Sequence, residues 1–317
     1  MSRIAIIGDT HFSPKTPVSR KDDYPSTLFN KLNSLLTLCI RENVTDCIFL
    51  GDLINANQMT VEYMVRLYGE FIAFKNNGID LHTVIGNHDM AHSNIDYLNK
   101  SAIALFISSG LFSTMSFVKD DTYFELIDYY VPVNELKPFN AGDLLHNIKC
   151  KVMCGHYFYL NGFNDMPHTI SPDMCKELNY NYYFLGHDHT PYDPLVKTNY
   201  EVHRPGSFSR ATSDTCQVNR DNIQICIFDT DTHKVEYKDI PDVLPSKDVY
   251  KESKLISKLN ESDLETTLSE DIDNLIDSMS FDFSSDIYTV LDSLDLKEEI
   301  KDKVTEYLME EGLFRHE

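Results

Sequence analysis

The first half of the chain alternates short apolar runs with longer segments whose apolar residues recur at helical spacing. Runs at residues 3–8, 46–51 and 82–86 predict three strands. Between them, residues 27–41 and 60–75 carry apolar side chains three and four positions apart, which predicts two helices. This alternation is typical of an α/β sheet with helices on its faces.

Strands predominate in the next part of the chain. Further runs rich in β-branched and aromatic residues predict strands at 123–128, 151–155, 182–186, 200–204, 223–228 and 234–238. Strands that gather after an alternating first half indicate a second sheet. We therefore predict an α/β fold in which two sheets form a β-sandwich flanked by helices.

The character of the sequence changes after residue 240. Residues 241–261 begin with a segment bounded by prolines, which predicts a linker after a first domain at 1–240. Ser262-Asp263-Leu264-Glu265 has the pattern of a capping box, and apolar residues then recur at helical spacing. We predict a small acidic helical C-terminal region at 262–317. It either packs as a solvated tail on its own domain or docks a partner.

The charge of the chain limits its partners. The formal net charge is −22 over 317 residues. Residues 246–317 hold 20 acidic and 8 basic side chains, so more than half of the surplus lies in the last quarter. Such a surface repels a bare polyphosphate backbone. Binding to a nucleic acid would therefore need cations from bound metals or from a partner protein.

Three features of the sequence indicate the compartment in which the protein is found. No run of about 18 apolar residues occurs, so we expect no membrane span and no membrane partner. The first residues offer no signal-peptide cleavage site. The seven cysteines are odd in number and form no CxxC pair, which favours reduced thiols. We expect a cytoplasmic protein.

Candidate chemistry lies where predicted strands end. At five places an apolar run is followed by glycine and then by aspartate, asparagine or histidine. These are Gly8-Asp9-Thr10-His11, Gly51-Asp52, Gly86-Asn87-His88-Asp89, Gly155-His156 and Gly186-His187-Asp188-His189. Ligands of α/β sheets bind beyond the carboxyl ends of strands, and glycine lets the backbone turn sharply there. One such motif alone is most often a turn or a cap. Five in succession indicate a functional site.

The residue types of these motifs suit a pair of transition-metal ions. Carboxylate, imidazole and amide oxygen together favour manganese, iron or zinc, whereas calcium and magnesium favour oxygen alone. Two ions about 3.5–4 Å apart need a bridging carboxylate and about three further ligands each. With Asp52 as the bridge, the predicted ligands are Asp9, His11, Asp52, Asn87, His156, His187 and His189. His88 is then an imidazole beside the ions that binds neither.

In their order, these motifs resemble the calcineurin-like metallophosphoesterase superfamily over residues 3–240. The resemblance implies a β-sandwich flanked by helices around a dinuclear metal centre. The ligands it implies for one ion are Asp9, His11, Asp52 and His189, and those for the other are Asp52, Asn87, His156 and His187. His88 matches the catalytic histidine of the family, which donates a proton or stabilises the transition state. Manganese is the first expectation for both ions, with magnesium, iron and zinc as alternatives.

Within the superfamily, the sequence is most similar to the SbcD-type nuclease branch. The similar segments are residues 79–89, Gly155-His156 with Asn161-Gly162-Phe163, and Pro205-Gly206-Ser207. The resemblance implies metal-assisted hydrolysis of DNA in recombination or repair, exo- or endonucleolytic, with an SbcC-type coiled-coil ATPase docked on the acidic C-terminal helices. It suggests a phage protein in the host cytoplasm. A homodimer that uses the helix at 60–75 stays open.

The sequence departs from this branch at three points, one of which is the acidic charge that disfavours tight independent binding of DNA. Asn55 stands where these nucleases usually carry histidine or aspartate. Residues 241–261 are too few for the DNA-capping domain of the branch and would be a vestigial cap. Two alternatives therefore remain: a phosphodiesterase for small or cyclic nucleotides, which needs no cap, and a mainly structural subunit that anchors an ATPase.

Overall fold

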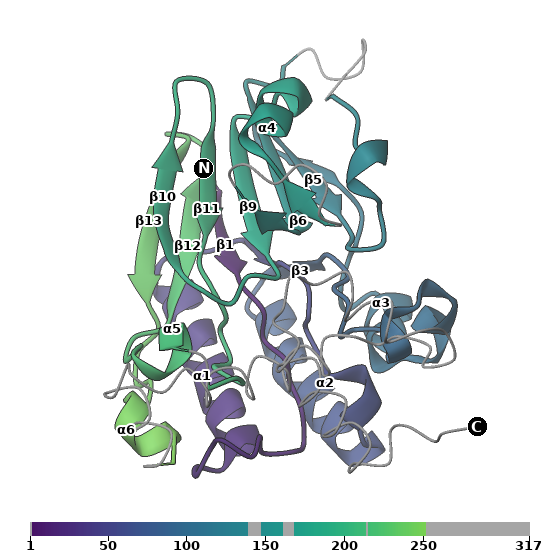
Figure 1. Cartoon of the computed structure of the whole chain (residues 1–317), viewed down its shortest axis with the longest axis vertical. Helices are drawn as coiled ribbons and strands as arrows, with labels where there is room; N and C mark the ends of the chain where they lie inside the picture. Colours follow the sequence, from purple (N-terminus) through teal and green to yellow (C-terminus); the bar gives the residue numbers. More distant parts are fainter. Residues whose placement is uncertain (1, 139–146, 161–167, 214, 252–317) are drawn as a thin grey trace, which may run out of the picture. The chain divides into compact units, whose positions relative to one another are not determined.

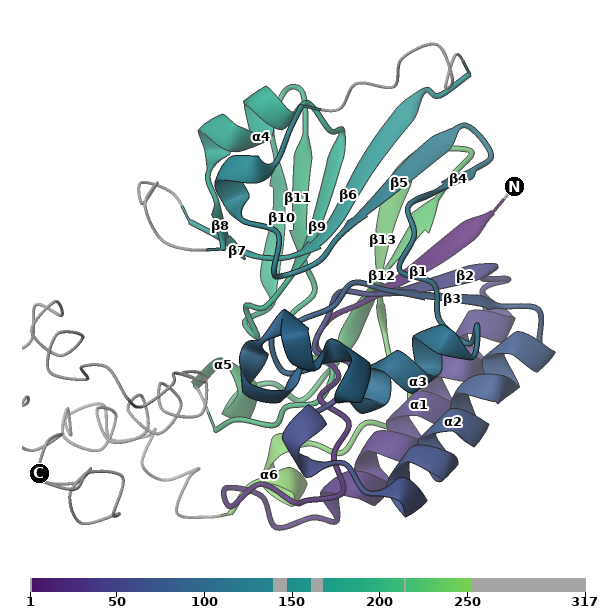
Figure 2. The ribbon, with the colours of Figure 1, turned by 90° about the vertical axis from the view of Figure 1, so that its right-hand side faces the viewer.

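The computed structural model describes residues 2–138, 147–160, 168–213 and 215–251. The predicted helices at 262–317 and the segment Asn161-Gly162-Phe163 lie outside the described residues. Two sheets face each other, with helices on their outer sides (Figures 1 and 2). This is the predicted α/β sandwich.

The first sheet has five strands in the order β13-β12-β1-β2-β3. Its parallel strands are β1 (Arg3–Ile7), β2 (Asp46–Phe49) and β3 (Asp80–Thr83). β12 (Gln224–Asp229) pairs antiparallel with β1, and β13 (Lys234–Asp239) pairs antiparallel with β12. Parallel neighbours need long crossover connections. The carboxyl ends of β1, β2 and β3 therefore lie at one edge of the sheet.

Helices α1 (Tyr24–Arg41) and α2 (Val61–Asn76) provide the first two crossovers and cover the outer face of this sheet (Figure 2). α1 begins three residues before the predicted start, because Asp23 caps it and a proline occupies its first turn. The Thr60 side chain caps α2 in the same way. Both helices thus start at residues whose side chains accept a backbone N–H.

The second sheet has six strands in the order β10-β11-β9-β6-β5-β4. The four inner strands are parallel and the two edge strands are antiparallel to their neighbours. The bounds are β4 (Phe117–Lys119), β5 (Thr122–Ile127), β6 (Cys150–His156), β9 (Tyr182–Gly186), β10 (Tyr192–Val196) and β11 (Glu201–Arg204). A separate two-stranded ribbon pairs β7 (Phe158–Tyr159) with β8 (Thr169–Ile170).

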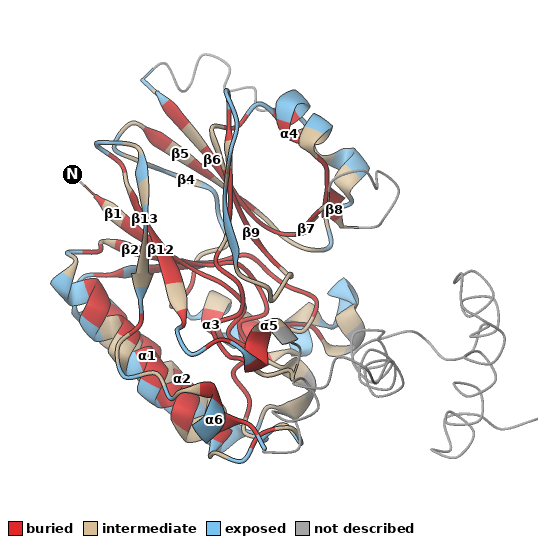
Figure 3. Cartoon of the chain, turned by 60° about the vertical axis from the view of Figure 1, so that its left-hand side comes forward, coloured by how far each residue is buried: buried red, intermediate tan, exposed pale blue. Residues whose placement is uncertain are grey.

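Apolar side chains fill three layers of core. On β1, Ile4 and Ile6 belong to the cluster between the two sheets, whereas Ala5 and Ile7 belong to the cluster under α1 and α2. A third cluster lies between the second sheet and α4 (Pro172–Leu178). Strands buried on both faces in this way read as continuous apolar runs (Figure 3). That burial explains why the central strands were predictable.

The end of β3 differs from the prediction of 82–86. Val84 N–H still donates to Phe49 O of β2 at 3.1 Å, but beyond it the backbone leaves the first sheet: Ile85 N–H donates to Asp128 Oδ1 at 2.7 Å, and Tyr129 N–H donates to Ile85 O at 2.8 Å. The apolar run therefore continues past the strand, because it connects the two sheets. This connection carries Asn87 toward the second sheet.

Several peripheral elements were not predicted. β10 contains Pro194 and is mostly exposed, as an edge strand can be. The remaining helices are short: α3 (Ala102–Ser108), α5 (Thr215–Val218), α6 (Ser246–Val249) and the 3₁₀ turns at Ala56–Gln58, Ala91–Ser93, Ile95–Lys100 and Val133–Glu135. None of the helices in the described ranges combines the length and the apolar character that crossing a bilayer requires.

The start of the predicted linker packs on the catalytic domain. Val249 and Tyr250 are buried. The Tyr250 hydroxyl is within hydrogen-bond distance of Arg210 O at 3.1 Å and of Thr212 O at 2.8 Å. The domain boundaries at 240 and 261 stay a prediction.

Candidate metal centre

Loops from both sheets meet at the edge formed by the carboxyl ends of the parallel strands. From the first sheet come Asp9 and His11 after β1, Asp52 after β2 and Asn87 after β3; from the second come His156 at the end of β6 and His187 and His189 after β9. All seven predicted ligands have a nearest neighbour within this set. Each of the seven has an atom within 4.8 Å of another member of the set, so the structure brings these side chains together.

Asp52 lies at the centre of the group. Its Oδ2 is 3.3 Å from His156 Nε2 and 3.7 Å from His11 Nε2, and its Oδ1 accepts the His88 N–H at 2.8 Å. The side chains form three overlapping clusters, and within each cluster the candidate ligand atoms lie within 4.8 Å of one another. The clusters are Asp9, His11 and His189; His11, Asp52 and His88; and Asp52, His156 and His187. A carboxylate shared between clusters is what a two-ion site needs.

Two histidine nitrogens face each other on the Asp9 side of this group. His11 Nε2 is 3.0 Å from His189 Nε2. His11 Nδ1 lies 3.1 Å from Asn55 Oδ1, an oxygen that can only accept, so Nδ1 carries the proton and Nε2 keeps its lone pair. Burial lowers the pKa of His11 to about 3 and that of His189 to about 4. Both imidazoles are therefore neutral, the form that binds metals.

On the other side of Asp52, His156 is fixed in a similar way. Its Nδ1 lies 2.7 Å from Leu50 O and donates to it, which leaves Nε2 facing Asn87 Oδ1 at 3.1 Å and Asp52 Oδ2 at 3.3 Å. Burial works to lower the pKa of His156, but Asp52 and Asp9 outweigh it and raise the pKa to about 9. Without a metal, a proton on His156 therefore offsets the charge of these carboxylates.

Asp9 provides a direct test of whether a cation fits. Its Oδ1 accepts the His187 N–H at 3.0 Å. Its Oδ2 is buried and has no hydrogen-bond partner among the described residues. Burial raises the pKa of Asp9 to about 7. A buried carboxylate oxygen without a partner is costly, and a bound cation would satisfy it. The donor set and this unpaired oxygen both fit a divalent ion.

The backbone is strained at three of the predicted ligands. His11, Asp52 and His187 have φ angles of 43°, 47° and 78°, in the left-handed region that L-residues rarely adopt. Such conformations cost about 1–3 kcal/mol each and concentrate at functional sites. Glycine is needed beside them: a Cβ at Gly86 would lie 2.2 Å from Asp52 Oδ1. At Gly51 it would lie 2.4 Å from the His156 ring.

Two residues near the ligands have supporting roles that the sequence did not reveal. Asp89 Oδ2 accepts the Gly86 N–H at 2.8 Å and Asp89 Oδ1 accepts the Ile54 N–H at 2.9 Å, so it ties the loops after β2 and β3 together. Burial and the nearby Asp52 raise the pKa of Asp89 to about 8. Asn55, a departure from the nuclease pattern, fixes the tautomer of His11. The only sequence signal for these two residues was their position, because Asp89 lies within a motif and Asn55 lies beside one.

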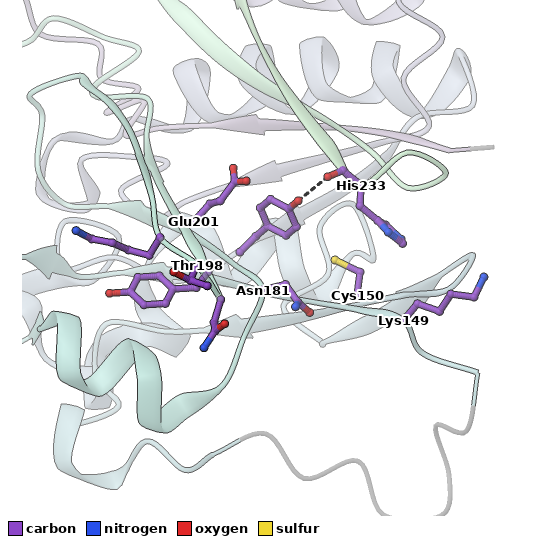
Figure 4. Close-up of a pocket in the computed structure, with 10 residues that line it drawn as sticks. Lys149, Cys150, Asn181, Thr198, Glu201 and His233 are labelled. Atoms are coloured by element: carbon purple, nitrogen blue, oxygen red, sulfur yellow. Dashed lines mark hydrogen bonds between the residues drawn. The ribbon is translucent and has the colours of Figure 1, made fainter.

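A hollow of about 240 Å³ lies at the other end of the second sheet (Figure 4). Cys150 at the start of β6 lines it, whereas His156 ends the same strand. Its residues Lys149 and His233 are paired with Asp121, at 3.0 and 2.9 Å. None of the seven predicted ligands lines this hollow. It is separate from the metal centre.

Comparisons with known proteins show the family of the chain. The family model for calcineurin-like phosphoesterases matches residues 2–191, more than half of the chain. Exonuclease subunit 1 of Enterobacteria phage T4 is 26% identical over 160 residues, which cover 47% of this chain and 45% of that protein. The match thus spans less than half the length of this relative.

Two solved structures match three quarters of the chain at low sequence identity. A novel archaeal phosphodiesterase is 15% identical, with a TM-score of 0.39, over 75% of this chain and 99% of that chain. A dimetal phosphatase from Danio rerio is 12% identical, with a TM-score of 0.43, over 75% of this chain and 98% of that chain. The family match, together with the clustered motifs, shows that the chain belongs to the calcineurin-like phosphoesterase family of metal-dependent phosphoester hydrolases.

Proposed function

We propose that the chain is the nuclease subunit of an SbcD-type complex and hydrolyses phosphodiester bonds in DNA during recombination or repair. The observation that carries this proposal is the group of overlapping clusters in which Asp52 is shared. The similarity to a phage exonuclease subunit supports DNA as the substrate. A phage-encoded protein of this kind would act in the host cytoplasm.

The proposed ligands divide between two ions. Asp9, His11, Asp52 and His189 would hold one, and Asp52, Asn87, His156 and His187 would hold the other. When bound, the ions would supply positive charge for the phosphate oxygens and lower the pKa of the attacking water. We propose manganese, because four imidazoles favour it over magnesium; iron and zinc are the alternatives.

His88 is proposed as the catalytic residue. Its backbone N–H holds Asp52 Oδ1 at 2.8 Å, so its own main chain is fixed relative to the bridging carboxylate. Its ring stands edge-on to His11, with the centroids 5.0 Å apart. From this place the imidazole can donate a proton to the leaving oxygen or stabilise charge on the phosphate. Because His88 also lies close to Asp52 and His11, the alternative role for its ring is to bind one of the ions. Substitution of His88 distinguishes these two roles.

The acidic charge of the chain makes a partner part of the proposal. A net charge of −22 weakens the binding of DNA by the chain alone, in which only the proposed bound ions would supply positive charge at the site. We propose that the region 262–317 docks an SbcC-type coiled-coil ATPase, which would also contribute to DNA binding. Truncation after Lys251 tests this and keeps the buried Tyr250 in place. Intact hydrolysis with lost ATPase binding supports docking, whereas an insoluble product indicates a tail that packs on its own domain. A homodimer stays a prediction.

A panel of substrates tests the reaction. The protein with manganese is given bis-p-nitrophenyl phosphate, cyclic nucleotides, and single- and double-stranded DNA. We expect hydrolysis of bis-p-nitrophenyl phosphate and DNA, with cyclic nucleotides the poorest substrates. The acidic surface favours small substrates as the second candidate function. Turnover of cyclic nucleotides without cleavage of DNA would establish that alternative and refute the nuclease.

A further inference from the structure

Four cationic side chains are buried together behind the metal centre. Arg20, Lys31, Arg210 and Arg220 are 0–8% exposed. Arg20 forms a bidentate pair with Asp22, at 2.9 and 2.7 Å. Burying charge is costly unless it is paired or hydrogen-bonded. The remaining donors of this cluster must therefore be matched by other acceptors.

Backbone carbonyls of the segment 205–210 accept from Arg20, Lys31 and Arg220, whereas Arg210 donates to Arg220 O and Leu244 O. Lys31 Nζ donates to Phe208 O at 2.5 Å and to Ser209 O at 3.0 Å. Arg20 Nη1 donates to Ser209 O at 2.9 Å and to Arg210 O at 2.8 Å. Lys31 and Arg20 thus both donate to the carbonyls of this one turn, and Arg220 does so as well.

Arg220 completes the set from the other side of the turn. Its Nη1 donates to Ser207 O at 2.9 Å and its Nη2 donates to Pro205 O at 3.1 Å. Burial and the neighbouring arginines hold the pKa of Lys31 well below its usual range. A neutral amine still has the two N–H donors that Lys31 uses, so its bonds do not depend on its charge.

The opposite side of the same turn holds two predicted metal ligands. Ser207 N–H donates to His189 O at 3.0 Å and Ser207 Oγ donates to Asp9 O at 3.1 Å. Phe208 N–H donates to Asp9 O at 2.9 Å. Ser207 and Phe208 therefore each connect a buried basic side chain to the main chain of a predicted ligand. The fit is tight, because a Cβ at Gly8 would lie 2.0 Å from Gly206 O.

We propose that Lys31, Arg20 and Arg220 are positioning residues for the metal ion held by Asp9, His11 and His189. Their hydrogen bonds hold the carbonyl groups of the turn toward these three basic side chains. The N–H groups of the turn are thereby held toward the main-chain carbonyls of Asp9 and His189. The inference rests on the proposed two-ion site. Groups that orient metal ligands typically contribute tenfold to hundredfold to metal affinity. No hydrogen bond in the described part of the chain joins this turn to His156 or His187, so the ion that these two residues would hold should bind unchanged.

Manganese titration of the full chain tests the inference. We expect two ions per wild-type chain by calorimetry, with the binding of one weakened about tenfold or more in Lys31→Met and the other unchanged. The matched control is Lys119→Met, the same substitution at a lysine paired with Asp46 at 2.7 Å. It should keep both affinities. Equal affinities in Lys31→Met and wild type would overturn the inference, and so would equal weakening of both ions.

A milder variant keeps the test decisive if Lys31→Met does not fold. Arg220→Lys replaces the guanidinium that donates to Ser207 O and Pro205 O with a single ammonium group and keeps the charge. It must show the same selective loss of one ion with a circular-dichroism spectrum like that of wild type; unchanged binding of both ions would overturn the inference. A wild-type chain that binds no pair of ions would instead refute the proposed function, and the inference with it.

Discussion

His156 Nε2 lies 3.3 Å from Asp52 Oδ2, and this contact joins the last residue of β6 in the second sheet to the loop after β2 in the first. His156 Nδ1 also donates to Leu50 O at 2.7 Å. The candidate metal centre is therefore complete only when the two sheets pack against each other. Metal binding should in turn stabilise the sandwich, because ligands that bind only the folded state raise its stability.

Replacement of the shared carboxylate tests its bridging role. Asp52→Asn keeps the shape of the side chain but removes its charge. We expect loss of bound manganese, measured by mass spectrometry of the metal, and a fall in kcat/KM of at least about a hundredfold. The control Asp80→Asn changes an aspartate at the exposed start of β3 and should keep both. Two retained ions with near-normal turnover would show that Asp52 is not the bridge.

The role of His88 is separable from that of the ligands. We expect His88→Ala to keep two ions and to lose about 10²–10⁴-fold in kcat, the range typical of a general acid or base. Metal content and turnover are measured on the same preparation. If metal content falls in parallel with activity, His88 is a ligand and its assignment here as the catalytic residue is wrong.

Glycine at position 86 is a steric requirement of the site. A Cβ there would lie 2.2 Å from Asp52 Oδ1 and 2.3 Å from Asp52 N, so Gly86→Ala should displace Asp52 and reduce both metal content and the free energy of unfolding. Gly69 in α2 has nothing within 4 Å of such a Cβ. Gly69→Ala should therefore stabilise the protein by about 0.5–1 kcal/mol. Equal effects of the two substitutions in urea unfolding would contradict this account.

A charge network at the edge of the sandwich predicts a pH dependence. Asp46 in β2 contacts His82 in β3 at 3.3 Å and Lys119 in β4 at 2.7 Å. Burial acts to raise the pKa of Asp46, but the bonds to His82 and Lys119 outweigh it and lower the pKa. Because the folded pKa is the lower one, this stabilisation is present above about pH 4 and is lost as the pH falls through the folded value.

The difference in melting temperature between wild type and Asp46→Asn checks this dependence. We expect the wild type to be more stable near neutral pH and the difference to shrink below about pH 4. A difference that stays constant from pH 7 to pH 3 would show that the network does not contribute through the charge of Asp46.

The centre of the fold was predictable because its strands are buried on both faces and end in glycine followed by a polar residue. That local pattern identified Asp9 and Asp52 without any knowledge of the tertiary structure. Lys31 was not predictable in this way, because its burial depends on a turn that lies far away in the sequence. β10 was missed for a related reason: its exposed edge position tolerates Pro194 and leaves no apolar run.

The most direct test of the central claim is anomalous scattering from crystals soaked in manganese. We predict two peaks per chain, about 3.5–4 Å apart, one on either side of the Asp52 carboxylate. His11 and His189 should contact one peak, and His156 and His187 the other. A single peak, or none beside Asp52, would contradict the two-ion centre on which the proposed nuclease depends.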